Sequence, residues 1–219
     1  MATRLVLGEL TAAYRQAAGV DVAIESVGGV VAAKRVQAGE QLDVVFLAAD
    51  AIDKLIAGGS VLPGSRIDLV RSPVAIAVRS GSPRPDIPSE AALRSAVLAA
   101  RSLGYSTGPS GTALLRLFEC WGIADELRER IVQAPPGVPV GKLVADGAVE
   151  LGFQQLSEML SQPGIDVVGA MPPGTEILTV FSGAVCAASK QPTAVHELLA
   201  YLQSPAAAAA KRRHGMEPA

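Results

Sequence analysis

The chain has 219 residues and a formal net charge of −2; 49% of it is hydrophobic but only 4% is aromatic. This length can bury a substantial core and fits one large domain or two small ones. The charge balance lacks the basic footprint of a nucleic-acid-binding protein, and the one basic run, residues 211–213, ends a predicted helix where cations favour the helix dipole. No stretch reaches the ~20 apolar residues of a membrane span, so no membrane insertion is expected.

The two cysteines, Cys120 and Cys186, lie far apart and have no CxxC or histidine-rich context. We therefore expect no disulfide framework, no metal site and no cofactor. The N-terminus lacks the basic, apolar and small-residue order of a secretory signal. The sequence as written predicts a cytoplasmic location, and a periplasmic one if its N-terminus is truncated.

The first third of the chain alternates helical and extended patterns. Leu5, Leu7, Leu10 and Tyr14 recur near helical spacing, and Gly19 follows as a stop. The predicted elements are a helix over 4–18, a strand over 20–26, a helix over 30–38, a strand over 43–49 and a helix over 51–57. Glycines stand at the corners between them, as short strand-to-helix loops require.

The alternation continues along the rest of the chain. The predicted strands are 68–80 (interrupted by Pro73), 102–106, 131–132, 151–153, 165–168 and 179–188; the predicted helices are 89–100, 113–121, 194–202 and 205–214. This order predicts an α/β fold with mostly parallel sheets flanked by helices. The runs 68–80 and 179–188 are natural hinge crossings, which gives a discontinuous first lobe, 1–76 plus 182–219, and a second lobe, 77–181.

Three loops fit an anion site, because ligands of open α/β sheets bind beyond the carboxyl ends of strands, where helices begin. They are residues 26–30, 48–50 and 106–112. The third combines two glycines with three hydroxyl side chains and leads directly into a helix. Each loop alone is also explained as an ordinary capped helix start. Only the three together favour a binding site.

No catalytic constellation is visible in the sequence. The run 108–112 lacks the lysine of a phosphate-binding P-loop and the spacing of a nucleophile elbow. His196 and His214 fall in the predicted C-terminal helices, and Asp146 and Glu150 have no partner in an acid–base arrangement. We therefore predict no catalytic residue and no enzymatic activity.

Taken in order, these segments resemble the molybdate-binding family of bacterial solute-binding proteins. The clearest match is the helix-to-strand passage 33–39 followed by 43–50; others are 144–147 with 151–153, and the closing segment 199–215. The resemblance implies a two-lobed type II periplasmic-binding-protein fold that closes on a small oxyanion. It also implies delivery to an ABC transporter permease.

The resemblance also indicates which residues would bind the ligand, and the sequence departs from the family there. The serine after the family's second strand falls on Gly29 or Val30, the serine of its Ser-Ala-Asp motif is Ala48, and a tyrosine of the second lobe becomes Gln155. The alanine whose backbone N–H would face the ligand is retained as Ala49. The family's first strand and a serine-bearing loop are expected to be missing from this sequence.

Fewer hydroxyls and more glycine predict a roomier site than a compact tetrahedral oxyanion needs. We therefore expect a small organic anion, a di- or tricarboxylate, taken up through an ABC system or sensed. The alternatives are molybdate or tungstate binding, a cytoplasmic effector-sensing module, and an enzyme on the same fold. The predicted ligand-binding residues are Gly28, Gly29, Val30, Ala48, Ala49, Ser110, Gly111, Thr112, Gln154 and Gln155.

Overall fold

A computed structural model of the protein describes residues 2–219. The chain forms two compact units: unit 1 comprises Met1–Ser72 and Thr179–Ala219, and unit 2 comprises Pro73–Leu178. The predicted boundaries, after residues 76 and 181, lie four and three residues further along the chain, and residue 1 lies outside the described residues. The chain passes between the units within two strands, β2 (Ile67–Arg79) and β7 (Leu178–Val185).

Unit 1 packs helices against strands that pair antiparallel. β1 runs beside β7, with Val44 opposite Val185, and the short C-terminal β8 runs beside the first part of β2. Its other elements are α1 (Arg4–Ala18), α2 (Gly29–Gln37), β1 (Val44–Ala48), α3 (Ala49–Ala57), α9 (Pro192–Gln203), the 3₁₀ turn η1 (Pro205–Ala207), α10 (Ala208–Arg213) and β8 (Glu217–Pro218). Leu7, Leu10, Leu202 and Met216 belong to the core that joins the N-terminal and C-terminal helices.

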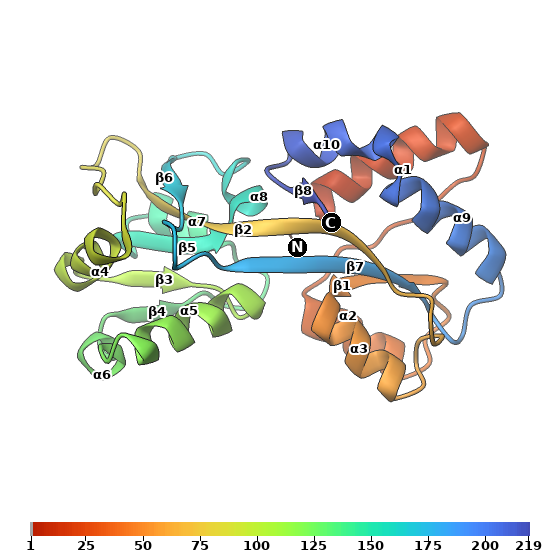
Figure 1. Cartoon of the computed structure of the whole chain (residues 1–219), viewed down its shortest axis with the longest axis horizontal. Helices are drawn as coiled ribbons and strands as arrows, with labels where there is room; N and C mark the ends of the chain where they lie inside the picture. Colours follow the sequence, from red (N-terminus) through yellow and green to blue (C-terminus); the bar gives the residue numbers. More distant parts are fainter. Residues whose placement is uncertain (1) are drawn as a thin grey trace. The chain divides into compact units, whose positions relative to one another are not determined.

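Unit 2 is built on a mixed sheet with helices around it (Figure 1). β3 lies between β4 and β5 and is parallel to both, whereas β2 runs antiparallel to β5 and to β6. The elements after β2 are α4 (Glu90–Ala99), β3 (Leu103–Tyr105), α5 (Pro109–Cys120), α6 (Ala124–Leu127), β4 (Ile131–Gln133), α7 (Val140–Ala145), β5 (Leu151–Gln155), α8 (Leu156–Met159) and β6 (Ile165–Ala170).

The core of unit 2 is mainly aliphatic, as the composition predicts. Phe118 of α5 and Phe153 of β5 are its largest buried aromatics and meet edge to face at 6.3 Å between ring centroids. Leu93, Leu103 and Leu114 fill the space around them with almost no exposure. Full burial of each such side chain contributes roughly 1.5–3 kcal/mol, so the sheet that carries the candidate site rests on a rigid base.

The structure confirms the α/β class with helices around the sheet and corrects three details. Residues 20–26 are irregular rather than a strand, because an extended segment needs a neighbour to satisfy its backbone and no described strand pairs with it. Helix α5 begins at Pro109 rather than at Ala113, since proline suits the first helical position. The expectation of mostly parallel pairing holds for β4–β3–β5 only; the crossing strands β2 and β7 make antiparallel pairs.

Candidate functional site

Two strand ends in unit 2 come out at one edge of the sheet. Tyr105 of β3 lies opposite Phe153 of β5 in parallel register. The residues next along the chain, Ser106 after the end of β3 and Gln154 within β5, therefore continue toward the same edge. Figure 1 shows α5 and α8, the helices that follow β3 and β5, at this same end of the strands. The predicted residues 110–112 and 154–155 thus share one region of unit 2.

Gln154 is fixed by the start of the neighbouring helix. Its side chain is only 3% exposed, and its Oε1 accepts hydrogen bonds from the backbone N–H groups of Val140 (2.8 Å) and Gly141 (3.4 Å). Val140 and Gly141 begin α7, whose first N–H groups have no partner within the helix. The amide oxygen is therefore used in the fold, and the amide nitrogen is left as the group that can donate elsewhere.

The side-chain amide of Gln154 also contacts the carboxylate of Glu158, which was not among the predicted site residues. The side chain of Gln154 makes a hydrogen bond with Glu158 of α8, and burial raises the pKa of the Glu158 carboxyl above its ordinary value. Gln155 ends β5 at 3% exposure. Ser157, beside Glu158, is 6% exposed, and its Oγ has no hydrogen-bond partner among the described residues. The available signal was a carboxylate three residues beyond Gln155, the last residue of a fully buried strand.

The predicted residues at the start of α5 have different surroundings. Ser110 is 4% exposed, and its Oγ hydrogen-bonds the Oγ of Ser106 at 3.0 Å. A Cβ on Gly111 would lie 1.9 Å from the backbone oxygen of Ser106, so only glycine allows this close approach of the helix to the turn that follows β3. Thr112 is exposed. Packing thus explains Gly111, while Thr112 leaves its hydroxyl open to solvent.

In unit 1 the predicted residues occupy two helix starts. Gly28 is the N-cap of α2, Gly29 its first residue, and Val30 is 65% exposed. Ala48 is the N-cap of α3, and Ala49 is its first residue. Both helices pack on β1 and on each other, so these five residues lie in one region of unit 1. Backbone N–H groups, rather than side chains, are what these positions offer an anion.

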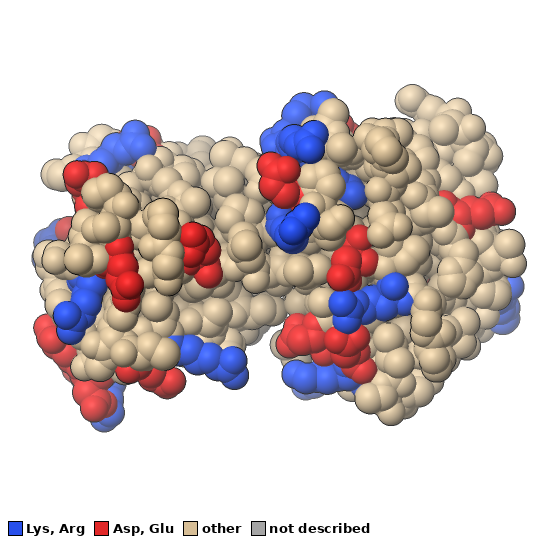
Figure 2. Space-filling model, viewed as in Figure 1, with Lys and Arg blue, Asp and Glu red and all other residues tan. Residues whose placement is uncertain are grey.

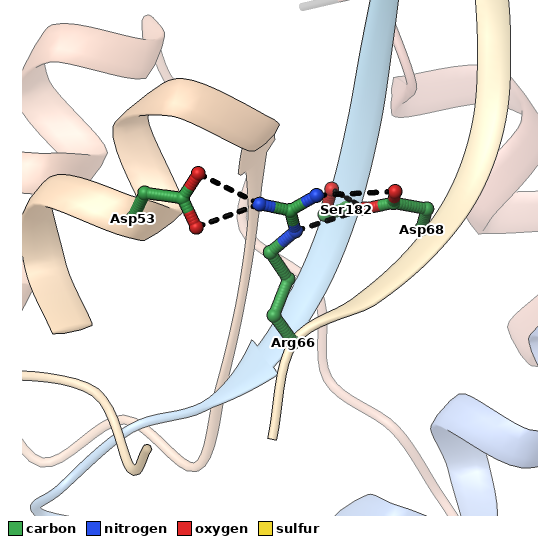
Figure 3. A network of polar contacts seen from close by, with 4 residues as sticks. All are labelled: Asp53, Arg66, Asp68 and Ser182. Carbon is green, nitrogen blue, oxygen red and sulfur yellow. Dashed lines mark hydrogen bonds and ion pairs between the residues drawn. The ribbon is translucent and has the colours of Figure 1, made fainter. Parts of the chain in front are cut away.

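A charged network holds α3 in place (Figure 3). Nη1 of Arg66 contacts both carboxylate oxygens of Asp53 on α3, at 2.6 and 2.7 Å. Its Nε and Nη2 donate to Asp68 of β2 at 2.9 and 3.1 Å, and the hydroxyl of Ser182 on β7 donates to Asp68 at 2.7 Å. The hydrogen bonds from Arg66 lower the pKa of the Asp68 carboxyl. The middle of α3, at Asp53, is thus linked through Arg66 and Asp68 to both crossing strands.

Other features of the described residues do not point to a different site. On the face drawn in Figure 2, acidic and basic side chains are interspersed, without a large basic patch. Among residues 2–219, no group of three His, Cys, Asp or Glu could hold a metal, and no helix is long and apolar enough to cross a membrane. An open groove of about 520 Å³ runs beside α1, lined by residues that include Arg15 and Asp21, and contains none of the predicted ligand residues.

Comparison with known proteins places the chain in a family. It is 40% identical over 215 residues to aconitate isomerase of a Pseudomonas species. The matched segment covers 96% of this chain and 82% of that protein. Its fold matches the periplasmic molybdate-binding protein of Azotobacter vinelandii with a TM-score of 0.79, at 22% identity, over 98% of this chain and 94% of that one. PEB3 of Campylobacter jejuni, solved with L-phospholactate bound, matches with a TM-score of 0.75 at 17% identity, over 98% and 95%.

The two structural matches confirm the predicted two-lobed periplasmic-binding-protein fold. The Pseudomonas relative carries the name of an enzyme. That name speaks against the prediction of no enzymatic activity. Residues 1–217 match the sequence pattern of one family, described as bacterial extracellular solute-binding protein. The chain therefore belongs to the bacterial extracellular solute-binding protein family.

Proposed function

We propose that this protein binds a small organic tricarboxylate, with aconitate as the first anion to test. The observation that carries the proposal is the 40% identity, over nearly the whole chain, to a protein named for aconitate. Aconitate is a tricarboxylate, and the loss of hydroxyl side chains at positions 29, 48 and 155 favours a di- or tricarboxylate over a compact tetrahedral oxyanion.

The chemistry of the two candidate regions supports such a ligand. Unit 1 offers backbone N–H groups at the starts of α2 and α3, including that of Ala49. Unit 2 offers the exposed hydroxyl of Thr112. Neutral donors of this kind hold a carboxylate without burying a counter-ion, and several together supply affinity of roughly 0.5–3 kcal/mol each. Each region by itself therefore has donors that suit a ligand carboxylate.

A thermal-shift screen tests the proposal directly. The panel contains aconitate, propane-1,2,3-tricarboxylate, succinate, molybdate, tungstate, sulfate and phosphate, each titrated against the purified protein. A ligand that binds only the folded state raises the melting temperature in a concentration-dependent way. We expect the tricarboxylates to do so. A shift with molybdate or tungstate and none with any carboxylate would refute the proposal.

The second candidate function is isomerisation of bound aconitate, favoured by the enzyme name of the same relative. This function, if the protein has it, overturns the prediction of no enzymatic activity. Proton nuclear magnetic resonance of cis-aconitate incubated with the protein would show the trans isomer appear if the activity is present. A saturable tricarboxylate site with no trans product would leave binding alone.

The partner of a binding protein of this family is also a proposal. We propose that the loaded protein delivers its anion to the permease of an ABC-type importer, with ligand sensing as the alternative output. Family membership supports this, because extracellular solute-binding proteins collect solutes outside the cell. Co-purification with a permease encoded nearby, dependent on added tricarboxylate, would test it.

A further inference from the structure

Glu158 differs from other carboxylates of unit 2. Glu150 pairs with Arg101 and Asp146 pairs with Lys142, in contacts whose side chains are largely exposed. Such surface pairs are well solvated and serve no further chemistry. Glu158 instead lies half-buried on α8, three residues after Gln155, which ends β5.

The surroundings of Glu158 hold the carboxylate in one orientation. The Gln154 amide hydrogen-bonds Glu158, while its own oxygen is locked by the N–H of Val140 at 2.8 Å. Because the amide cannot flip without losing that contact, it presents its nitrogen to the carboxylate. Ser157, the residue before Glu158, is 6% exposed, and its Oγ has no hydrogen-bond partner within residues 2–219. An unused buried hydroxyl costs stability, which favours a polar ligand group at this place.

Burial of Glu158 also suits proton transfer. It raises the pKa of the carboxyl above its ordinary value, the direction that makes a carboxylate a stronger base. Helix α5 packs on β5, and the neutral donors at its start can stabilise negative charge that develops on a ligand carboxylate.

We propose that Glu158 is the group that moves the proton in aconitate isomerisation, an inference that rests on the second candidate function above. The carboxylate of Glu158 takes a proton from the methylene carbon beside the double bond, breaking that C–H bond. The electron pair forms a new double bond to the central carbon. The former double bond breaks, and its far carbon takes a proton from Glu158. No atom is gained or lost, and no oxidant, reductant or cofactor is required.

The experiment compares the parent with Glu158→Gln, Glu158→Asp and a surface control, Glu119→Gln, whose exposed side chain lies outside the candidate site. Each protein is incubated with cis-aconitate in D₂O, and magnetic resonance follows both the trans isomer and deuterium entering carbon positions. Propane-1,2,3-tricarboxylate, which has no double bond, reports binding separately by titration calorimetry and confirms that each variant folds.

We expect Glu158→Gln to lose at least about 100-fold in conversion and exchange, while its affinity for propane-1,2,3-tricarboxylate stays within about tenfold of the parent. Glu158→Asp should recover part of the rate, and Glu119→Gln should match the parent.

If Glu158→Gln converts aconitate at a rate within threefold of the parent's rate, the assignment of Glu158 is wrong and the isomerase function stands. A parent that binds the saturated tricarboxylate but neither converts nor exchanges aconitate overturns both. A parent that binds no tricarboxylate overturns the proposed function itself.

Discussion

The Oε1 of Gln154 accepts a hydrogen bond from the backbone N–H of Val140 at 2.8 Å, joining the buried end of β5 to the first turn of α7. This contact satisfies a helix donor that otherwise has no partner and orients the amide nitrogen toward Glu158. One glutamine thus connects the fold of unit 2 with its candidate chemistry.

Gln154→Leu should destabilise the protein by about 1–3 kcal/mol, because the N–H of Val140 would stay buried without an acceptor. The exposed Gln133, at the end of β4, provides a matched control, and Gln133→Leu should change stability by less than about 0.5 kcal/mol. Urea denaturation gives both values. Equal effects from the two substitutions would mean that the Val140 contact adds nothing to stability.

Gly111 and Gly108 make a second matched pair at the start of α5. A Cβ at Gly111 would lie 1.9 Å from the backbone oxygen of Ser106, whereas at Gly108 the nearest atom, the Oγ of Ser106, is 3.8 Å away. We expect Gly111→Ala to cost about 1–3 kcal/mol through overpacking and Gly108→Ala to be nearly neutral. Thermal melts of the two variants decide this. A normal melting temperature for Gly111→Ala would show that the close approach of α5 to β3 is absent in solution.

The raised pKa of Glu158 makes a signed prediction about pH. A carboxyl with a raised pKa binds its proton more tightly in the folded state than in the unfolded chain. Its stabilising contribution is therefore full below the ordinary value of 4.5 and is lost as the pH rises through the folded pKa. Melting temperatures of Glu158→Gln and parent should differ least at pH 4 and favour the variant increasingly toward pH 8. A difference independent of pH would contradict the burial of this carboxyl.

The two cysteines should react at very different rates. Cys186 is buried in unit 1, and burial raises the pKa of its thiol to about 11, so little thiolate is present near neutral pH. Cys120 on α5 is exposed. A colorimetric thiol reagent should modify one thiol per chain rapidly in the folded protein and the second only after unfolding. Cys120→Ser should abolish the fast phase, and rapid labelling that persisted in this variant would show that Cys186 is accessible.

Much of the fold follows from local pattern. The helix predicted over 4–18 coincides with α1, because apolar residues at helical spacing are followed by Gly19 in the left-handed region, at a φ of 70°. The predicted strand over 68–80 runs through Pro73, and so does β2. The segment 20–26 was predicted wrongly, because alternation describes a strand only when another strand lies beside it.

The candidate site was less accessible from sequence. Glycines in the run 108–112 looked alike, yet only Gly111 is needed for close packing, a fact that depends on the distance to Ser106. Glu158 carried no motif, and its interest arises from burial and from the Gln154 amide, both products of the folded chain. Family membership was recognisable because turns and strand ends recur in order, whereas ligand identity depends on a few substitutions.

The measurement that tests the central claim most directly is a calorimetric titration of the purified protein with propane-1,2,3-tricarboxylate, with molybdate titrated in parallel. A tricarboxylate-binding protein should give a saturable heat for the first anion and none for the second, and the saturated ligand excludes any contribution from turnover. Saturable binding of molybdate with no heat from the tricarboxylate would contradict the account.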